Sequence, residues 1–287
     1  MTRSVLAGID GSAQSTAAAH WAADEARRRG VPLRLLHVRT WLDDTRPAAE
    51  DVADHRSPTG RMLSAVEREI RETHPALDVR VEVVESEEPV DVLVEAADES
   101  ELLVLGSRGL GGFAGLLVGS VGLAAAAHGN VPTVLVPAAA AGRPAGAQVV
   151  VGVDTRAPAA DVLDFAFHQA AERRAALRAV HAWTPPPVWG YAGWVAPASE
   201  AEQFRVIESE LLTRAMTGWQ EKYPTVAVVE DCRIDGAAGA LVDLSAEAAL
   251  VVVGRRRRPH RAGLRLGPVA HAVLHHAHAP VAVVPHD

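Results

Sequence analysis

A glycine-rich segment in the first half of the chain has the residue types and spacing of a phosphate-binding loop. In GSRGLGGFAGLLVGS (106–120), Gly106, Gly109 and Gly119 follow the spacing G-x2-G-x9-G, and Ser120 comes next. Glycine lets a backbone adopt positive φ angles and approach an anion, which successive amides can then surround. A helix that begins after Gly119 would add unpaired amides, with the Ser120 hydroxyl as its cap. We expect a phosphate-binding loop here; the motif alone leaves open a flexible loop with no ligand.

The matching segment of the second half, GRRRRPHRAGLRLGP (254–268), keeps only part of this pattern. Arg257 stands at the position of the middle glycine, and Pro268 at the position of the serine. Arginine at a positive φ angle would be strained, and proline has no amide hydrogen to donate. We therefore expect the phosphate site of this half to be weak or absent. The residues of such a weak second site would be Asp154, Gly254, Arg257 and Gly267.

The run Arg255–Arg258 leaves three interpretations open. We favour a solvated basic loop on an acidic chain. A site in which these arginines, with Arg261 and Arg265, hold an anion by their side chains comes second. Contact with an acidic partner or nucleic acid comes last, because the formal net charge of −8 argues against a general nucleic-acid binder, which needs a basic face.

Other groups that could do chemistry lack the partners that they would need. His271 and His275 are four residues apart, but no carboxylate follows the H-E-x-x-H pattern. The single cysteine, Cys232, has no matching His/Asp arrangement, and neither G-x4-G-K-[ST] nor G-x-S-x-G occurs. We expect no catalytic residues and no metal bound by side chains.

The segments that would position these residues occur twice. VLAGIDGS (5–12) resembles VVVGVDTR (149–156), and LRLLHVRTW (33–41) resembles LRAVHAWTP (177–185), both 144 positions apart. Gly106 and Gly254 are 148 positions apart, as are Gly119 and Gly267. A duplicated domain explains these offsets. We expect domains at 1–137 and 148–287, joined by an Ala-, Gly- and Pro-rich linker at 138–147.

Each half alternates short apolar runs with helical patterns. SVLAGID, LRLLHV, ELLVLG and PTVLVP have the pattern of strands, whereas Ser15–Arg29, Arg61–Thr73 and Ser120–His128 have that of helices. Gly30 follows the first helix as an expected C-cap. Continuous apolar strands that alternate with helices predict an α/β fold with parallel strands. We expect two tandem doubly wound domains, each with a five-stranded parallel sheet flanked by helices.

This arrangement resembles the universal stress protein family, in the tandem two-domain form of its ATP-binding branch. The resemblance rests on VLAGIDGS, LLHV, the glycine loop and VPTVLVP. It implies that Asp10 faces the nucleotide, that Val38 lies where the backbone reads the adenine edge, and that the loop holds ribose and phosphates. Gly122 departs from the Ser or Thr that the family often has. The implied nucleotide contacts are Gly8, Ile9, Asp10, Val38, Gly106, Arg108, Gly109, Gly119, Ser120 and Val121.

The resemblance further implies ATP, with Mg or Mn held by its phosphates, in a stress-response regulator or sensor whose first domain holds most of the nucleotide. One alternative is an interaction module whose second domain binds no nucleotide. Another is an enzyme that slowly hydrolyses ATP or transfers adenylyl groups, although the H-x-G-H and S-G-G-x-D-S signatures of such relatives are absent.

We also expect a cytoplasmic protein, because no apolar run suits a signal peptide or a membrane helix. The family pairs domains edge to edge through their last strands, here PTVLVP and PVAVVP. We expect the two domains to pair in this way within the chain, and the chain to form a homodimer. A regulatory protein partner of unknown identity is expected, but no membrane or nucleic-acid partner.

Overall fold

The computed structural model describes residues 3–40, 57–109, 118–137, 148–184, 198–257 and 266–287. The predicted linker 138–147 lies outside the described residues. In the first half the elements are β1 (Ser4–Gly8), α1 (Ala13–Arg29), β2 (Leu33–Arg39), α2 (Pro58–Thr73), β3 (Val79–Glu85), α3 (Pro89–Ala97), β4 (Ser100–Gly106), α4 (Ser120–His128) and β5 (Thr133–Val136).

The second half repeats this order. Its elements are β6 (Gln148–Gly152), α5 (Ala160–Arg173), β7 (Ala176–Trp183), α6 (Ala198–Lys222), β8 (Val228–Ile234), α7 (Ala237–Leu244), β9 (Ala248–Arg256), α8 (Pro268–His276) and β10 (Val281–His286). The strands predicted from short apolar runs are confirmed, and α4 spans the residues that the sequence predicts for it.

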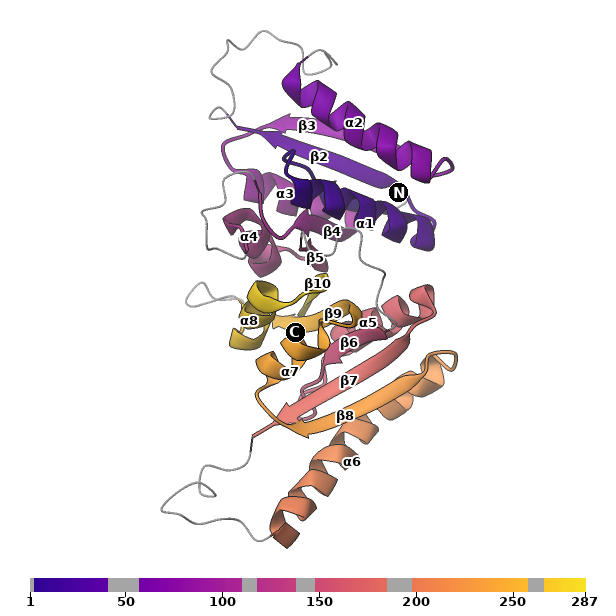
Figure 1. The fold of residues 1–287 in the computed structure, drawn as a ribbon, viewed down its shortest axis with the longest axis vertical. Helices are drawn as coiled ribbons and strands as arrows, with labels where there is room; N and C mark the ends of the chain where they lie inside the picture. The colour runs from indigo at the N-terminus through magenta and orange to yellow at the C-terminus, as the bar shows by residue number, and fades with distance from the viewer. Residues whose placement is uncertain (1–2, 41–56, 110–117, 138–147, 185–197, 258–265) are drawn as a thin grey trace.

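One sheet runs through the whole molecule (Figure 1). Its order is β3-β2-β1-β4-β5-β10-β9-β6-β7-β8. Each half contributes five parallel strands, as expected, and the halves join where β5 and β10 pair antiparallel, with Val134 opposite Ala282. The predicted edge-to-edge pairing of the last strands within the chain is therefore confirmed.

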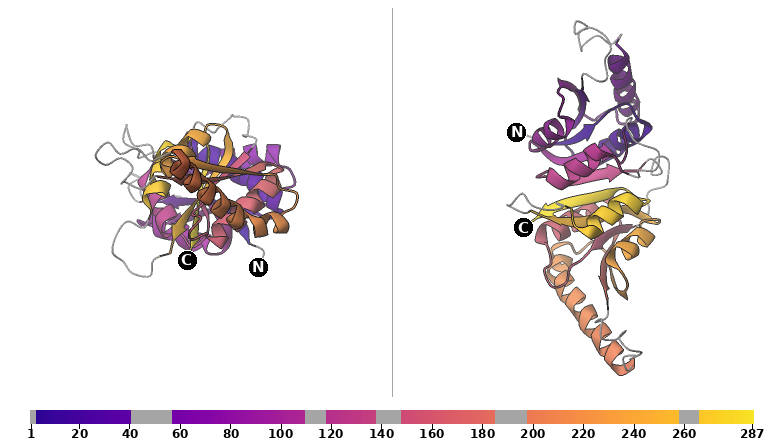
Figure 2. Two further views of the ribbon diagram at one scale, coloured as in Figure 1. Left: turned by 90° about the horizontal axis from the view of Figure 1, so that it is seen from below. Right: turned by 90° about the vertical axis from the view of Figure 1, so that its left-hand side faces the viewer.

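Helices cover both faces of this sheet (Figure 2). One apolar core joins the sheet to α1, α2, α5 and α6, through residues such as Ala22, Leu63, Phe167 and Leu212. A second core joins the other face to α3, α4, α7 and α8. Because both cores contain residues of both halves, apolar burial supports the junction on each side of the sheet. None of the described helices is long and apolar enough to cross a membrane.

Capping groups fix the ends of α1, which leads away from the candidate site. Ser12 is its N-cap and accepts a hydrogen bond from the Ser15 amide at 3.1 Å. Gly30 ends the helix with φ of 66°, a conformation that glycine adopts without steric cost, and so confirms the predicted C-cap. Three arginines in the last turn complement the negative end of the helix dipole.

Polar contacts between α1 and α5 form the Glu25 cluster, which consists of Glu25, Arg28, Arg29, Gln169 and Arg173. The Glu25 side chain is fully buried. It accepts hydrogen bonds from Gln169 Nε2 at 2.5 Å, from Arg173 Nη2 at 2.8 Å and from Arg29 Nε at 2.8 Å. The cluster therefore ties one half to the other beside the apolar core.

Candidate functional site

The carboxyl ends of β1, β2 and β4 carry the first-half candidates. The Ile9 amide donates to the Leu36 carbonyl at 2.9 Å, and the Ile9 carbonyl accepts from Nδ1 of buried His37 at 2.7 Å. These contacts continue the sheet beyond β1 and so place Asp10 at the side of the sheet where the carboxyl ends of the parallel strands lie. His37 thus has a structural contact, as its position in an apolar strand predicts. Ligands of open parallel sheets bind outside this edge.

Asp10 lies against the first turn of the glycine loop. Its Oδ1 accepts from the Ser12 amide at 2.9 Å, a local turn that orients the carboxylate. A Cβ atom added to Gly109 would lie 2.4 Å from the Asp10 Oδ2. Asp10 and Gly109 are therefore in contact, although 99 positions separate them in the sequence.

The two ends of the loop meet. The Ser107 amide donates to the Val136 carbonyl at 2.8 Å, and the Gly119 amide donates to the Ser107 carbonyl at 2.7 Å. Ser12 Oγ also donates to the Arg108 carbonyl at 3.4 Å. The structure thus brings Asp10, Arg108, Gly109 and Gly119 together, while residues 110–117 of the loop lie outside the described part of the chain.

The glycines fulfil a different role from the one predicted. Gly106, Gly109 and Gly119 do not have positive φ angles; among the described glycines only Gly11 and Gly30 do. Gly106 is needed because a Cβ would lie 2.8 Å from backbone atoms at the start of α1. Close packing, rather than a left-handed backbone, explains Gly106 and Gly109, whereas a Cβ on Gly119 would make only ordinary contacts.

The start of α4 also differs from the prediction in one respect. Gly119 is the N-cap and Ser120 the first helical residue, so the prediction that Ser120 caps this helix is wrong. No described side chain caps α4, and the amides of Ser120, Val121 and Gly122 precede the first intrahelical bond, which Leu123 makes to Gly119. These amides can donate to an anion.

Two further candidates have structural explanations. A Cβ on Gly122 would lie 3.2 Å from Leu135 Cδ2, so the Ser or Thr of the family pattern would require this side chain of β5 to shift by a few tenths of an ångström. A Cβ on Gly8 would lie 2.4 Å from Leu105 Cδ2. Val38 lies at the end of β2 and packs, half-buried, on the core that faces α3 and α4.

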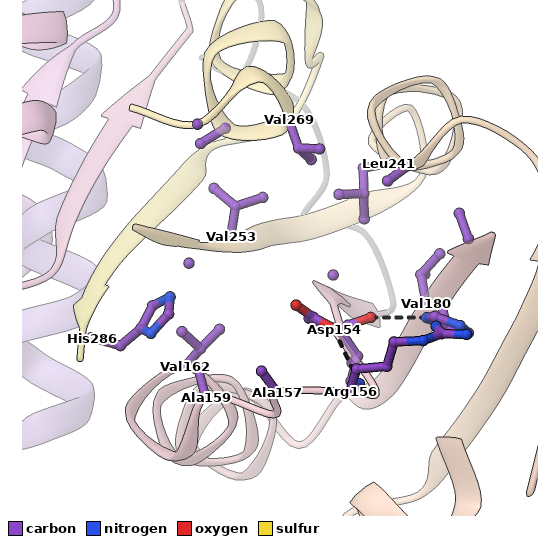
Figure 3. A pocket seen from close by; sticks show the side chains of 18 of the residues that line it. Asp154, Arg156, Ala157, Ala159, Val162, Val180, Leu241, Val253, Val269 and His286 are labelled. Atoms are coloured by element: carbon purple, nitrogen blue, oxygen red, sulfur yellow. Dashed lines mark hydrogen bonds between the residues drawn. The ribbon is translucent and has the colours of Figure 1, made fainter. Parts of the chain in front are cut away.

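The second half has a cavity of about 740 Å³ at the equivalent edge of its sheet (Figure 3). It is bounded by α5, α7, α8 and the ends of β6, β7 and β9. Counterparts of most first-half candidates line it: Gly152, Val153, Asp154, Ala182, Gly254, Arg256, Gly267 and Val269. Of the predicted second-site residues, the structure brings Asp154, Gly254 and Gly267 together, whereas Arg257 is not part of the lining.

The arginine run is largely engaged with the first half. Arg255 is 7% exposed and donates to the Gly129 carbonyl, so the favoured interpretation as a solvated loop is wrong for this residue. Arg257 donates to the Asn130 carbonyl at 3.3 Å. Its φ angle is not positive, since Arg174 is the only described non-glycine residue with one, and the predicted strain is absent. Arg258, Arg261 and Arg265 lie outside the described residues.

Sequence reasoning missed a buried polar group in this cavity. His181 contacts the Val153 carbonyl through Nδ1 at 3.1 Å and Glu208 Oε2 through Nε2 at 3.0 Å. Arg156 Nη2 donates to Glu208 Oε1 at 2.6 Å. Burial raises the pKa of Glu208, but hydrogen bonds from Arg156 and His181 reverse this effect and hold it below the ordinary value. Glu208 follows a stretch of sequence that has no regular hydrophobic pattern. The sequence therefore gives no indication that this glutamate lies in the cavity.

The model for the universal stress protein family matches residues 1–137 and again residues 147–285. This chain belongs to the universal stress protein family. It has the tandem form, because the model matches it twice. Universal stress protein Rv2005c of Mycobacterium tuberculosis is 36% identical to it over 291 residues, which cover 97% of this chain and 96% of that protein.

A solved structure shows the same fold over the whole chain. This universal stress protein is similar to PA1789 of Pseudomonas aeruginosa, described as functionally unknown, with a TM-score of 0.66 and 16% identity over 100% of this chain and 93% of that one. A universal stress protein solved in complex with cAMP is 30% identical over 47% of this chain and 97% of its own, with a TM-score of 0.37. The cAMP belongs to that protein.

The described residues also bear on metal binding. They contain no group of three or more His, Cys, Asp or Glu side chains placed to hold a metal ion. The rings of His271 and His275 lie 4.5 Å apart on α8. Burial, with the neighbouring His271 and His276, lowers the pKa of His275.

Proposed function

We propose that this universal stress protein is an ATP-binding regulator of a stress response, and that its first half holds most of the nucleotide. The observation that carries the proposal is the meeting of Gly109, Gly119 and Asp10 beside the uncapped start of α4. Three amides without intrahelical partners and the positive end of the α4 dipole favour a phosphate there. The missing Cβ at Gly109 leaves space in which a larger residue would displace the Asp10 carboxylate.

The proposed contacts are those that the resemblance implies, with the adenine near Val38 and the phosphates at the loop. The described residues fit a nucleotide whose Mg or Mn ion is held mainly by phosphate oxygens, since Asp10 is the carboxylate that packs on the loop. We propose that the nucleotide biases which protein partner is bound, and that hydrolysis is slow. The proposed domains are 1–137 and 148–287, with the linker at 138–147.

The homodimer remains a prediction. Strands β5 and β10, through which the family pairs domains, are joined to each other within this chain. A dimer would therefore need another surface, and β3 and β8 are the strands left at the edges of the sheet.

ATP stoichiometry measured by calorimetry tests the first-half site. We expect the wild-type protein to bind about one ATP tightly, and Gly109→Arg to weaken that binding at least tenfold, because even a Cβ collides with Asp10. The matched control is the reverse exchange at the equivalent position, Arg257→Gly, which should leave tight ATP binding intact. Equal ATP binding by wild type and Gly109→Arg would refute the assignment to the first half.

A further inference from the structure

Strand β8 forms one border of the sheet, and half of its backbone groups point outward (Figure 1). The Leu177 amide donates to the Ala227 carbonyl at 2.8 Å, and the Asp235 amide donates to the Trp183 carbonyl at 3.2 Å. Because successive residues of a strand turn their backbone groups to opposite sides, the odd-numbered residues of β8 pair with β7. An open border of this kind is a template for another chain. The residues whose amides and carbonyls point to it are Val228, Glu230, Cys232 and Ile234.

Exposed apolar side chains gather beside this border. The described part of the chain has six large apolar side chains that are exposed, and five of them lie on α6 or β8. Phe204 stacks on Trp183, whose register partner in β8 is Ile234, so α6 and the end of β8 share one surface. Such clusters mark interaction sites, whereas single exposed apolar residues are ordinary. The five are Phe204, Val206, Ile207, Val229 and Ile234.

A stripe of uncharged residues on α6 faces the same border, and we call it the α6 stripe. Thr213 Oγ1 donates to Glu230 Oε2 at 2.5 Å, which places Thr213 beside β8. Helical spacing puts Val206, seven residues earlier, and Thr217, four residues later, on the same flank as Thr213. A second molecule that meets β8 would therefore find an uncharged helix face next to the strand. The α6 stripe consists of Val206, Ser209, Thr213 and Thr217.

The sequence of β8 is complementary to itself in one antiparallel register. A two-fold axis perpendicular to the sheet brings together residues whose side chains lie on the same face. With this axis at Cys232, Asp231 of each copy lies opposite Arg233 of the other. With the axis at Glu230, Asp231 or Arg233 instead, that residue would face the same charge in its own copy. Charge therefore favours the register centred on Cys232.

The border at β3 is less open to a second copy. The Ser86 amide donates to the Arg39 carbonyl at 3.1 Å, so by the same alternation the Val79 carbonyl points outward. Arg71 of α2 already donates to this carbonyl at 2.9 Å. Arg71 also pairs with Glu67 at 2.8 Å, so the flank of α2 beside β3 is charged where the α6 stripe is not. Of the two borders, β8 is the one suited to pairing.

We propose that β8 pairs antiparallel with β8 of a second copy of this chain, with Cys232 at the two-fold axis and with the two α6 stripes packed against each other. The sheet then continues from one molecule into the next. The inference rests on the homodimer expected above and names its interface. The proposed nucleotide site lies in the other half of the chain, so both copies keep it open.

Sedimentation equilibrium of the full-length protein at micromolar concentration tests the surface. Ile234→Pro removes an outward amide and leaves the β7–β8 ladder intact, so the dissociation constant of the dimer should rise at least tenfold. Glu85→Pro, at the equivalent position of β3, is the matched control and should leave it unchanged.

Each other outcome counts against the inference. A wild-type monomer would refute the homodimer itself. Equal dissociation constants for wild type and Ile234→Pro would refute the β8 surface alone. Assemblies that grow beyond two copies would indicate that β8 meets β3 in an open chain, which also overturns the proposal.

Charge exchange tests the register. Arg233→Glu and Asp231→Lys each place like charges opposite each other, and each should weaken its own dimer at least tenfold. In an equimolar mixture both opposite pairs are again unlike, so native mass spectrometry should show mixed dimers. Arg233→Lys keeps the charge and should dimerise as wild type does. With both variants folded by circular dichroism, the absence of mixed dimers would overturn the register centred on Cys232.

Discussion

Replacing Glu25 by glutamine should destabilise the protein more than neutralising the charge of any exposed side chain would. The carboxylate is fully buried between α1 and α5, and three arginines and Gln169 donate to it. Burial alone raises the pKa of Glu25, but the attraction of Arg173 and Arg29 and the hydrogen bonds bring it from 4.5 to about 2. Burial also lowers the pKa of Arg173, against the attraction of Glu25.

The size of the effect follows from the pKa. A carboxyl pKa lowered from 4.5 to about 2 corresponds to about 3 kcal/mol of stability at neutral pH. Glutamine keeps the shape but leaves the Arg173 side chain, 7% exposed, without a carboxylate, and leaves Arg29, 8% exposed, with Glu101 alone. We therefore expect the free energy of unfolding of Glu25→Gln, measured in urea at pH 7, to fall by about 3 kcal/mol.

The pH dependence gives an independent check. Because the folded pKa is depressed, the contribution of Glu25 is present above pH 4.5 and is lost as the pH falls toward about 2. Glu25→Gln should lack this component of acid sensitivity. Glu69→Gln is the control, since Glu69 is 52% exposed beside His20, and should change stability by at most about 1 kcal/mol. A Glu25→Gln protein as stable as wild type at pH 7 would refute the reasoning.

Three substitutions elsewhere test the same physical reasoning by thermal or urea unfolding. Gly30→Ala should cost about 1 kcal/mol, because φ is 66° there although nothing crowds the site; a neutral result would mean that the cap is not strained. Gly218→Ala, in α6 with open space around it, should stabilise the protein by about 0.5–1 kcal/mol, and a loss of stability would contradict the helix assigned there. Phe167→Ala should cost about 3–5 kcal/mol, because Phe167 is fully buried against Trp219 and Tyr223; a cost below 1 kcal/mol would show that the core refills the cavity.

The local elements could be predicted because their signals are local. Apolar runs mark β1, β2, β4 and β5, and Gly30 marks the end of α1. The repeated last strands also pointed to the β5–β10 junction. The order of the helices and strands, and the sheet edge at which Asp10 lies, followed from these patterns together with the rules for parallel sheets.

The detailed roles of residues could not be predicted in the same way. The sequence shows that Gly106 and Gly109 lack a Cβ, but not that Gln14 and Asp10 occupy the space beside them. Long side chains such as Arg255 can reach solvent, a ligand or another domain, and only the packed structure shows that it reaches Gly129. The indole nitrogen of Trp183 likewise depends on tertiary surroundings.

The Glu25 cluster has a consequence for which halves can associate. Positions 25 and 169 correspond in the repeat, as do 29 and 173, so a glutamate of one half meets a glutamine at the matching place of the other. Two copies of the first half, docked alike, would bury two carboxylates against each other. Two copies of the second half would bury two arginines with no carboxylate between them. Only the unlike pair places the Gln169 amide and the Arg173 guanidinium of one half against the Glu25 carboxylate of the other, and this selects the partner within the chain over a neighbouring molecule.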